Sequence, residues 1–334
     1  MKRKSITLIG GEGYIGTVVR NYFLTKNFKV NSIDNVIYNQ SLKINKFNKN
    51  FNFLRYNFAN KKIFNLLDKL DHDNLIILGS IVGDPITKKY PKITKKINLE
   101  ATERLLKYAL NNKFKKVIFI STCSNYGIFD KNSLAKENSR LNPKSLYAKT
   151  KVEIEKKILK ISKKSNSETT ILRFATAFGL SDRMRFDLTV NQFVREIYLN
   201  KKIKVYDPYT WRPYCHVKDF ANIIFQIVSR KNIKRHKCEI FNAGSSKNNF
   251  NKMMVINKIK KYVKNFDIIL QNDSADQRDY KVNFSKIKKV YNFKPTISIE
   301  QGIKEILNEL RKGKFKKLSN FKDKLGNYRI NKNV

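Results

Sequence analysis

A chain of 334 residues is longer than a single hydrophobic core usually supports, about 250 to 300 residues, so one large and one smaller domain are expected. Hydrophobic residues make up 41% and aromatic residues 12%, which excludes a chain that is disordered throughout. The 70 Lys and Arg residues outnumber the 27 Asp and Glu residues, and this net charge of +43 keeps a nucleic-acid-binding protein open.

Short β-branched segments alternate with longer helical patterns in the first half of the chain. We predict strands at 6–10, 29–34, 51–56, 74–79, 116–121 and 169–174. Helices are predicted between them, at 14–26, 91–111 and 145–164. Strands separated by helices at this spacing favour parallel βαβ units, and therefore an α/β fold with a doubly wound parallel (Rossmann) sheet.

The pattern becomes less regular after about residue 175. We predict helices near 187–200, 217–230, 250–264 and 299–312, and strands near 203–206 and 238–242. These elements indicate a smaller, mixed α/β C-terminal lobe. We therefore divide the chain into a Rossmann domain at 1–175, completed by 216–245; a smaller lobe at 176–215 and 246–312; and a basic, loosely held tail at 313–334.

The segment GGEGYIG (10–16) follows the first predicted strand and opens the first helix. Its three glycines have the spacing of a dinucleotide-binding turn. The first makes the turn, the second lets the backbone approach a pyrophosphate, and the third lets helix and strand pack closely. The residues predicted to bind the cofactor here are Gly10, Gly13, Tyr14, Ile15 and Gly16.

Asp34 lies at the end of the next predicted strand. A carboxylate at this position accepts hydrogen bonds from the adenosine ribose and would repel a 2′-phosphate, so NAD is favoured over NADP. Glu12, inside the glycine turn, must point away from the phosphates to be tolerated.

Tyr147 and Lys151 are four residues apart in a predicted helix, which places both on one face. A tyrosine that acts as a base at neutral pH needs its pKa lowered by about three units, or roughly 4 kcal/mol. One cation at about 4 Å in an effective dielectric near 20 supplies about that much. Lys151, helped by the positive nicotinamide ring, could therefore let Tyr147 take the proton of a substrate hydroxyl while hydride leaves for the cofactor.

Such a reaction needs a further hydroxyl group to hold the substrate oxygen. It should come from the end of a neighbouring strand, where open α/β sheets bind their ligands. The fifth predicted strand ends in ISTCS (120–124), so Thr122 or Ser124 can serve.

The distribution of charge and cysteine bears on partners and compartment. Basic residues are spread along the whole chain beside many Asn, Ile, Phe and Tyr residues, which favours codon drift over one RNA-binding face. The apolar stretch at 75–83 is far shorter than a membrane span, so no membrane partner is expected. Cys123, Cys215 and Cys238 form no CxxC pair. We expect reduced thiols, no metal site and a cytoplasmic protein.

Several motifs in the same order make the chain resemble the extended short-chain dehydrogenases/reductases that act on nucleotide sugars as epimerases and dehydratases. They are GGEGYIG (10–16), Asp34, GSIVGDP (79–85), INLEAT (97–102), STCSNYG (121–127), the pair Tyr147 and Lys151, LRFATAFG (172–179), RPYCHVKD (212–219) and YNFKPTISIEQGIKE (291–305). The resemblance covers nearly the whole chain. It implies NAD as cofactor, a nucleotide-diphosphate sugar bound by the smaller lobe, and a homodimer.

The resemblance also implies roles for individual residues. Thr122 would orient the substrate beside the catalytic pair Tyr147 and Lys151, while Asn57 and Phe58 would lie near the adenine. The run 178–193 is similar to enzymes of surface-polysaccharide pathways that include C4-oxidising enzymes acting on GDP-linked heptoses. The candidate substrate-binding residues are Thr176, Arg185, Asn191, Arg212 and Arg278, the last two as ligands of the diphosphate.

One departure from the family pattern separates the possible reactions. Family 4,6-dehydratases carry Asp-Glu directly after the catalytic threonine, whereas this chain has Cys123 and Ser124. Oxidation at sugar C4, followed by return of hydride or release of the keto sugar, is therefore favoured. Two alternative functions stay open: a 4,6-dehydratase and an RNA-binding protein. In a dehydratase Cys123 could pass a proton to the substrate; in the other cases it is a small packing residue.

Overall fold

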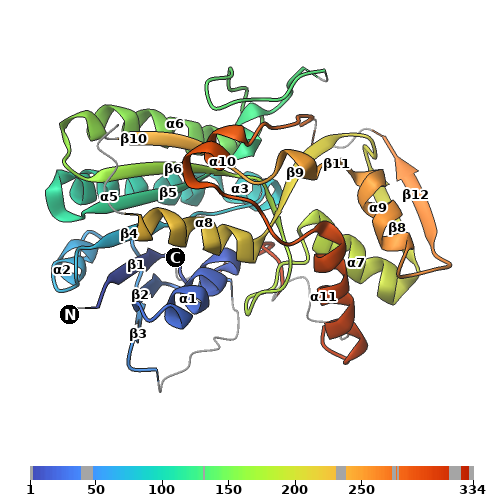
Figure 1. Ribbon diagram of the computed structural model, residues 1–334, viewed down its shortest axis with the longest axis horizontal. Helices are drawn as coiled ribbons and strands as arrows, with labels where there is room; N and C mark the ends of the chain where they lie inside the picture. The colour runs from blue at the N-terminus through green and yellow to red at the C-terminus, as the bar shows by residue number, and fades with distance from the viewer. Residues whose placement is uncertain are drawn as a thin grey trace.

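A seven-stranded parallel sheet forms the centre of the molecule (Figure 1). The computed structural model describes residues 3–38, 48–130, 132–230, 238–272, 276, 278–315 and 325–330. The strand order is β10-β6-β5-β4-β1-β2-β3, so the chain starts in the middle and builds outwards to both sides. The strands are β1 (Ser5–Ile9), β2 (Lys29–Asp34), β3 (Phe51–Arg55), β4 (Asn74–Ile77), β5 (Lys116–Thr122), β6 (Glu168–Phe174) and β10 (Cys238–Ala243).

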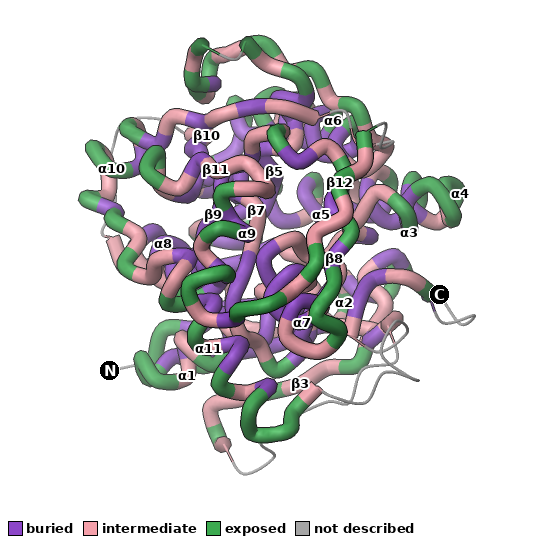
Figure 2. The backbone as a smooth tube through the Cα atoms, turned by 90° about the vertical axis from the view of Figure 1, so that its right-hand side faces the viewer, coloured by how far each residue is buried: buried purple, intermediate pink, exposed green. Residues whose placement is uncertain are grey.

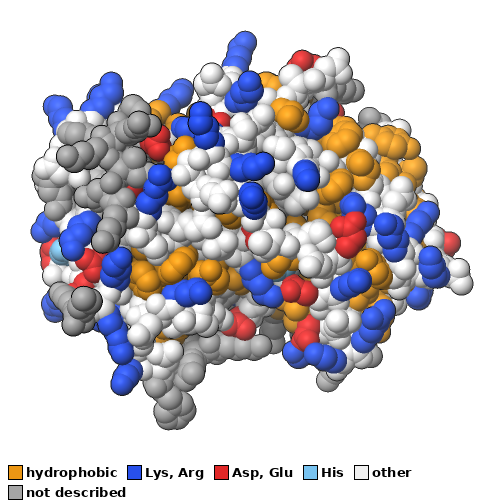
Figure 3. Space-filling view, in the orientation of Figure 1, with side chains coloured by type: hydrophobic (Ala, Val, Ile, Leu, Met, Phe, Trp, Pro, Cys, Tyr) orange, Lys and Arg blue, Asp and Glu red, His pale blue; other side chains and the backbone are white. Residues whose placement is uncertain are grey.

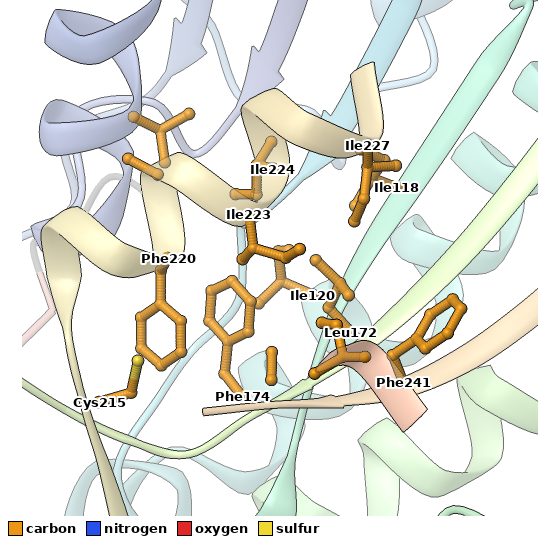
Figure 4. Close-up of a cluster of buried hydrophobic side chains, with 14 of the residues drawn as sticks. Ile118, Ile120, Leu172, Phe174, Cys215, Phe220, Ile223, Ile224, Ile227 and Phe241 are labelled. Carbon is orange, nitrogen blue, oxygen red and sulfur yellow. The ribbon is translucent and has the colours of Figure 1, made fainter. Parts of the chain in front are cut away.

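Helices cover both faces of this sheet, which explains its apolar strands. In β5, Ile118 and Ile120 face one helical layer, whereas Val117 and Phe119 face the other. The first layer contains α1 (Tyr14–Thr25) and α8 (Val217–Ser229), and the second contains α5 (Thr102–Tyr108) and α6 (Leu146–Ile161). Figure 4 shows the α8 side chains packed on those of β5 and β6.

Shorter helical segments connect the strands of the sheet. The α-helices among them are α2 (Ile63–Leu67), α3 (Asp84–Lys89) and α4 (Pro91–Lys95). Between α4 and β5 the chain also has the π-helical segments η1 (Lys96–Ala101) and η2 (Ala109–Lys113). The 3₁₀ turns are η3 (Cys123–Tyr126), η4 (Ser162–Lys164) and η5 (Ser246–Asn248).

A smaller lobe packs beside the carboxyl edge of the sheet, at the right in Figure 1, and has an apolar core of its own. Figure 2 looks onto this lobe and shows its buried segments behind an exposed rim. Its helices and strands are β7 (Thr176–Phe178), α7 (Thr189–Asn200), β8 (Lys202–Tyr206), β9 (Trp211–His216), β11 (Asn249–Asn251), α9 (Lys252–Lys260), β12 (Asp267–Gln271) and α11 (Ile299–Arg311). The short helix α10 (Ser285–Tyr291) lies instead beside α8 and β10, and its Ile287 belongs to the core of the central sheet.

The predicted fold class is confirmed, because the sheet is parallel, doubly wound and accompanied by a smaller mixed lobe. The segment 216–245 supplies the edge strand β10, as the predicted division assumes, although the domain boundaries themselves stay a prediction. Strands β7, β9, β11 and β12 were not predicted, since two of them have only three residues and show no periodicity.

The prediction of a loosely held tail is wrong for residues 325–330. The backbone N–H of Phe186 donates to the Leu325 carbonyl at 2.8 Å, and Ile330 packs in an apolar cluster with Ile81 and Ile97. Within the described residues, no helix combines the length and apolar character that a membrane span requires.

Candidate active site

A cavity of about 1100 Å³ opens at the carboxyl edge of the central sheet and continues into the smaller lobe. Parallel strands end there together, so their following loops meet around one space. The predicted site residues that line it are Gly10, Gly13, Tyr14, Ile15, Gly16, Asp34, Asn57, Phe58, Thr122, Tyr147, Lys151, Thr176, Arg185, Arg212 and Arg278.

The glycine turn is shaped to receive a dinucleotide. A Cβ on Gly10, whose φ is +82°, would lie 2.6 Å from Gly79, and a Cβ on Gly16 would lie 2.4 Å from the Gly10 carbonyl oxygen. At Gly13 the nearest atom would be 3.4 Å away, so this glycine faces the open cavity instead. Gly10 and Gly16 therefore permit close packing, and Gly13 leaves room for a pyrophosphate at the start of α1.

Asp34, which the sequence predicts to contact the adenosine ribose, is held in place at the cavity wall. Its carboxylate accepts hydrogen bonds from the backbone N–H groups of Glu12, at 3.0 Å, and Val36, at 2.8 Å. Burial raises the pKa of Asp34 to about 6, against these two donors, which favour the charged form. The Glu12 side chain is buried against Arg20 and Ser32 outside the cavity, so it points away from the phosphate position as predicted.

The turn is fastened to the smaller lobe through Tyr14. Its hydroxyl donates to the Gly179 carbonyl at 2.7 Å and accepts from Asn191 Nδ2 at 2.9 Å. Asn191 is fully buried, also donates to the Arg185 carbonyl, and does not line the cavity. Asn191 was predicted to bind substrate, and the structure corrects this: its amide is used up in joining the two lobes.

Thr122, Tyr147 and Lys151 meet at the floor of the cavity. Thr122 ends β5, and its hydroxyl oxygen accepts from the Ser124 backbone N–H at 3.1 Å. Lys151 reaches from α6 to the Ile120 carbonyl, 2.7 Å from its Nζ, and this Nζ lies 5.7 Å from the centroid of the Tyr147 ring. The strand and the helix thus bring the predicted catalytic groups together.

Burial dominates the charge states of the catalytic pair. It raises the pKa of Tyr147 well above its usual value, and the positive charge of Arg185 is the main influence that opposes this shift. Burial lowers the pKa of Lys151 to about 7, while the negative charge of Glu155 acts in the opposite direction. We predicted that Lys151 would supply the charge beside Tyr147; in the structure the charge that acts most to lower the Tyr147 pKa is that of Arg185.

A buried ion pair lies directly behind the catalytic helix. Arg173 Nη2 on β6 is 2.6 Å from Glu155 Oε2 on α6, and both side chains are about 3% exposed. Glu155 also accepts hydrogen bonds from Ser121 Oγ and from Asn125 Nδ2. Since Glu155 is one helical turn after Lys151, this network fixes the catalytic helix against the strand that carries Thr122.

Cys123 lies outside the cavity. Its side chain is 1% exposed, belongs to the core on the α8 side of the sheet, and donates to the Arg173 carbonyl at 3.2 Å. Burial raises the pKa of this thiol well above its usual value. The minor hypothesis that Cys123 passes a proton to substrate is not supported by this placement, which is that of a packing residue.

Two arginines that line the cavity, Arg212 and Arg278, share one carboxylate. Arg278 Nε donates to Asp276 Oδ1 at 2.6 Å, and Arg212 Nη2 lies 3.1 Å from the same oxygen. Burial acts to raise the pKa of Asp276, but these arginines hold it well below its usual range. Arg278 also pairs with Asp84 at 2.7 Å. Since Arg212 and Arg278 both line the cavity, a diphosphate has two planar guanidinium groups within reach.

Some residues of the cavity wall were not predicted: Asp84, Arg183, Asp187, Lys252, Asp276, Asn327 and Tyr328. Asp84 follows the fourth strand of the sequence, at the edge where ligands bind, and this position could have identified it. Asp187 pairs with Arg185 at 2.5 Å, which leaves Arg185 at the wall with its charge partly neutralised. No sequence pattern indicated the C-terminal contribution.

A family model described as the NAD dependent epimerase/dehydratase family matches residues 6–244. The chain belongs to this family. The family, the NAD dependence and the epimerase/dehydratase class predicted from the sequence are therefore confirmed. The glycine turn and Asp34 fit that cofactor.

Relatives of the chain extend over nearly its whole length. An uncharacterised protein of Methanocaldococcus jannaschii, MJ1055, is 30% identical over 92% of this chain and 96% of its own. A UDP-glucuronate 4-epimerase of Thermodesulfobacterium geofontis is 25% identical over 90% and 94%. The structure of the Bacillus cereus UDP-glucuronic acid 4-epimerase, in complex with UDP-glucuronic acid and NAD, matches with a TM-score of 0.79 at 21% identity, over 92% and 99%. At that identity the match supports the fold.

Proposed function

We propose that the protein oxidises C4 of a nucleotide-diphosphate sugar and returns the hydride, which makes it an NAD-dependent 4-epimerase. The observation that carries the proposal is one continuous cavity. It joins the glycine turn, the catalytic groups Thr122, Tyr147 and Lys151, and the arginine pair of the smaller lobe. The curated 4-epimerase named above supports it at sequence level.

Each residue of the catalytic group has a part in this reaction. The hydroxyl of Thr122 holds the C4 oxygen beside Tyr147, and the Tyr147 oxygen takes the proton of that hydroxyl group. Arg185, and Lys151 once it is protonated, stabilise the negative charge that Tyr147 carries before the transfer. NAD, held by the glycine turn and Asp34, supplies the hydride acceptor.

The second step reverses the first on the other face of the sugar. Tyr147 then returns its proton to the C4 oxygen, so the chain needs no further acid for epimerisation. Arg212 and Arg278, which line the cavity, hold the diphosphate through their planar forks, while the sugar turns to present either face to the catalytic group. Two anchored phosphates and a mobile sugar are therefore compatible with a 4-epimerase.

Dehydration would need an acid and a second base at the sugar. Cys123 is buried in the core, and Ser124 Oγ is a hydroxyl that accepts from Arg278 at 3.1 Å. The nearby carboxylates Asp84 and Asp276 both pair with Arg278. This arrangement argues against the 4,6-dehydratase alternative.

The face of the molecule drawn in Figure 3 gives little support to RNA binding. In Figure 3 the Lys and Arg side chains are scattered over the visible face and interspersed with Asp and Glu. A nucleic-acid interface concentrates its charge on one face or groove. The dispersed charge agrees with drift in composition.

Replacement of Tyr147 by Phe tests the proposal. The variant should bind NAD with unchanged affinity in calorimetry and should lose at least about a hundredfold in turnover, because only the hydroxyl that moves the proton is removed. Tyr209→Phe, at an exposed tyrosine outside the cavity, is the matched control and should retain full activity. Full activity of Tyr147→Phe would refute the proposal.

Two further properties stay predictions. We expect a homodimer from the family resemblance, which light scattering on the purified protein would test. The three cysteines are free thiols in the structure, in keeping with the predicted cytoplasmic location.

A further inference from the structure

Arg183 differs from the other arginines that line the cavity. Arg185, Arg212 and Arg278 each lie within ion-pair distance of a carboxylate. Arg183 is 3% exposed and makes no ion pair with any residue in the described ranges. The carboxylates of Asp187 and Asp34 act on the Arg183 charge only from beyond ion-pair distance. A buried charge that lacks a contacting counter-charge is costly, so a ligand that supplies one is favoured there.

The guanidinium of Arg183 is only partly satisfied by the protein. Its Nη2 donates to the Gly326 carbonyl at 3.3 Å, and its central carbon lies 4.8 Å from the centroid of the Tyr38 ring. Its Nε has no acceptor among the residues that the structure describes. Burial, followed by repulsion from Arg185, lowers the pKa of Arg183 to about 10, so the group is still a cation at neutral pH.

The loop that carries Arg183 rests on the first turn of α1. Ser181 Oγ donates to the Tyr14 carbonyl at 2.7 Å and lies 2.8 Å from Thr17 Oγ1. The backbone N–H of Arg183 donates to this same Ser181 oxygen at 3.2 Å. The backbone of Arg183 therefore lies beside the N-terminus of α1. In a dinucleotide-binding fold the backbone N–H groups at this end of the helix face the pyrophosphate.

The other side of Arg183 faces the ribose position. The negative charge of Asp34 is one of the influences on the Arg183 pKa, so the two groups are close enough to interact. Asp34 is the residue that receives the adenosine ribose. Arg183 thus lies along the part of the cavity wall that the adenosine diphosphate half of NAD would contact.

The C-terminal segment fixes Arg183 in this position. Besides Gly326, which accepts from the guanidinium, Asn327 Nδ2 donates to the Val82 carbonyl at 2.8 Å, and Asn327 and Tyr328 line the cavity. The Asn327 amide oxygen is buried and has no partner in the described part of the chain. The wall therefore offers a cationic donor and a neutral acceptor side by side.

We infer that Arg183 binds the pyrophosphate of NAD and that residues 326–327 of the C-terminal segment position it. A pyrophosphate oxygen would give the unused Nε an acceptor and would bring a negative charge within ion-pair distance of the guanidinium. The inference rests on NAD binding by the family and is independent of the sugar and of the step at C4.

Calorimetric titration of the full chain with NAD, ADP and adenosine, without any sugar, tests this inference. In Arg183→Gln, the Kd for NAD and for ADP should rise by about ten- to a hundredfold, the usual loss for a hydrogen bond to a charged group. The Kd for adenosine should not change, because it has no phosphate. Arg195→Gln is the matched control: Arg195 is also buried in the smaller lobe but does not line the cavity, so its affinities should match the wild type.

Two results would overturn the inference. The first is an unchanged Kd for ADP in Arg183→Gln. The second is an equal loss for ADP and adenosine together with a lower urea midpoint of the unliganded variant, which would give Arg183 a structural role. Since no sugar is present, neither result depends on whether the 4-epimerase proposal is correct.

Discussion

The buried lysine of the catalytic pair makes the stability of the unliganded protein depend on pH in a defined window. Lys151 is 2% exposed, and burial lowers its pKa from 10.5 to about 7. Between pH 7 and pH 10.5 the unfolded chain binds a proton at this residue that the folded protein does not. The free energy of unfolding therefore rises with pH across this window, and the lysine destabilises the fold most below pH 7.

The magnitude follows from the two pKa values. One pKa unit corresponds to about 1.4 kcal/mol, and about two units separate pH 9 from the folded pKa of Lys151. From pH 6 to pH 9, Lys151 should thus add about 3 kcal/mol to the free energy of unfolding of the wild type. Lys151→Met lacks this contribution, so its stability relative to the wild type should fall by the same amount over that interval.

Urea denaturation of both proteins at pH 6, 7.5 and 9 measures this difference, with Trp211 fluorescence and far-UV circular dichroism as probes. Comparison at each pH cancels the other titrating groups. Lys149→Met, at an exposed position of the same helix, is the control and should follow the wild type at every pH. A stability difference between Lys151→Met and wild type that stays constant from pH 6 to pH 9 would refute a depressed Lys151 pKa.

Three other variants test separate parts of the site. Thr122→Val should lower kcat about a hundredfold with little change in KM, because the hydroxyl acts on the developing charge; steady-state kinetics with an unchanged kcat would contradict it. Cys123→Ala should lower the free energy of unfolding by about 1 kcal/mol and leave the pH dependence of turnover unchanged. If the change in turnover at alkaline pH disappeared in this variant, the thiol would take part in proton transfer. Glu155→Gln should cost about 3 kcal/mol in urea denaturation, since it leaves Arg173 buried without its counter-charge, and a cost below about 1 kcal/mol would show that the pair is not needed.

The sequence predicted the central sheet and the catalytic group because both follow local patterns. Strands covered on two faces have continuous β-branched runs, as in KVIFIS at 116–121. The glycine spacing and the four-residue step from Tyr147 to Lys151 are fixed by turn and helix geometry. These features needed no knowledge of distant contacts.

The incorrect predictions concern residues whose side-chain direction depends on contacts between distant parts of the chain. In the run 178–193 the candidates were Arg185 and Asn191, and only the packing of the lobes decides that Arg185 lines the cavity while Asn191 joins Tyr14 to the loop. Cys123 follows Thr122 directly, but the two side chains face opposite sides of the strand end, core and cavity. Side-chain direction in such segments depends on tertiary contacts that a single sequence does not reveal.

The C-terminal segment shows the same limit over a longer distance. Residues 325–330 belong to the stretch 313–334, which is basic and aperiodic in sequence. In the structure Asn327 nevertheless contacts Val82 and lines the cavity. A contact between residues 245 positions apart leaves no periodicity to detect.

The central claim is hydride transfer at C4 without enolisation or loss of water. Incubation of the purified protein with UDP-, GDP- and dTDP-hexoses in heavy water, followed by mass spectrometry and chromatographic separation of the C4 epimers, tests it most directly. We expect an epimer of unchanged mass from at least one of these sugars, and no product with Tyr147→Phe. Incorporation of deuterium, which requires enolisation at C3 or C5, or a product lighter by one water would contradict it.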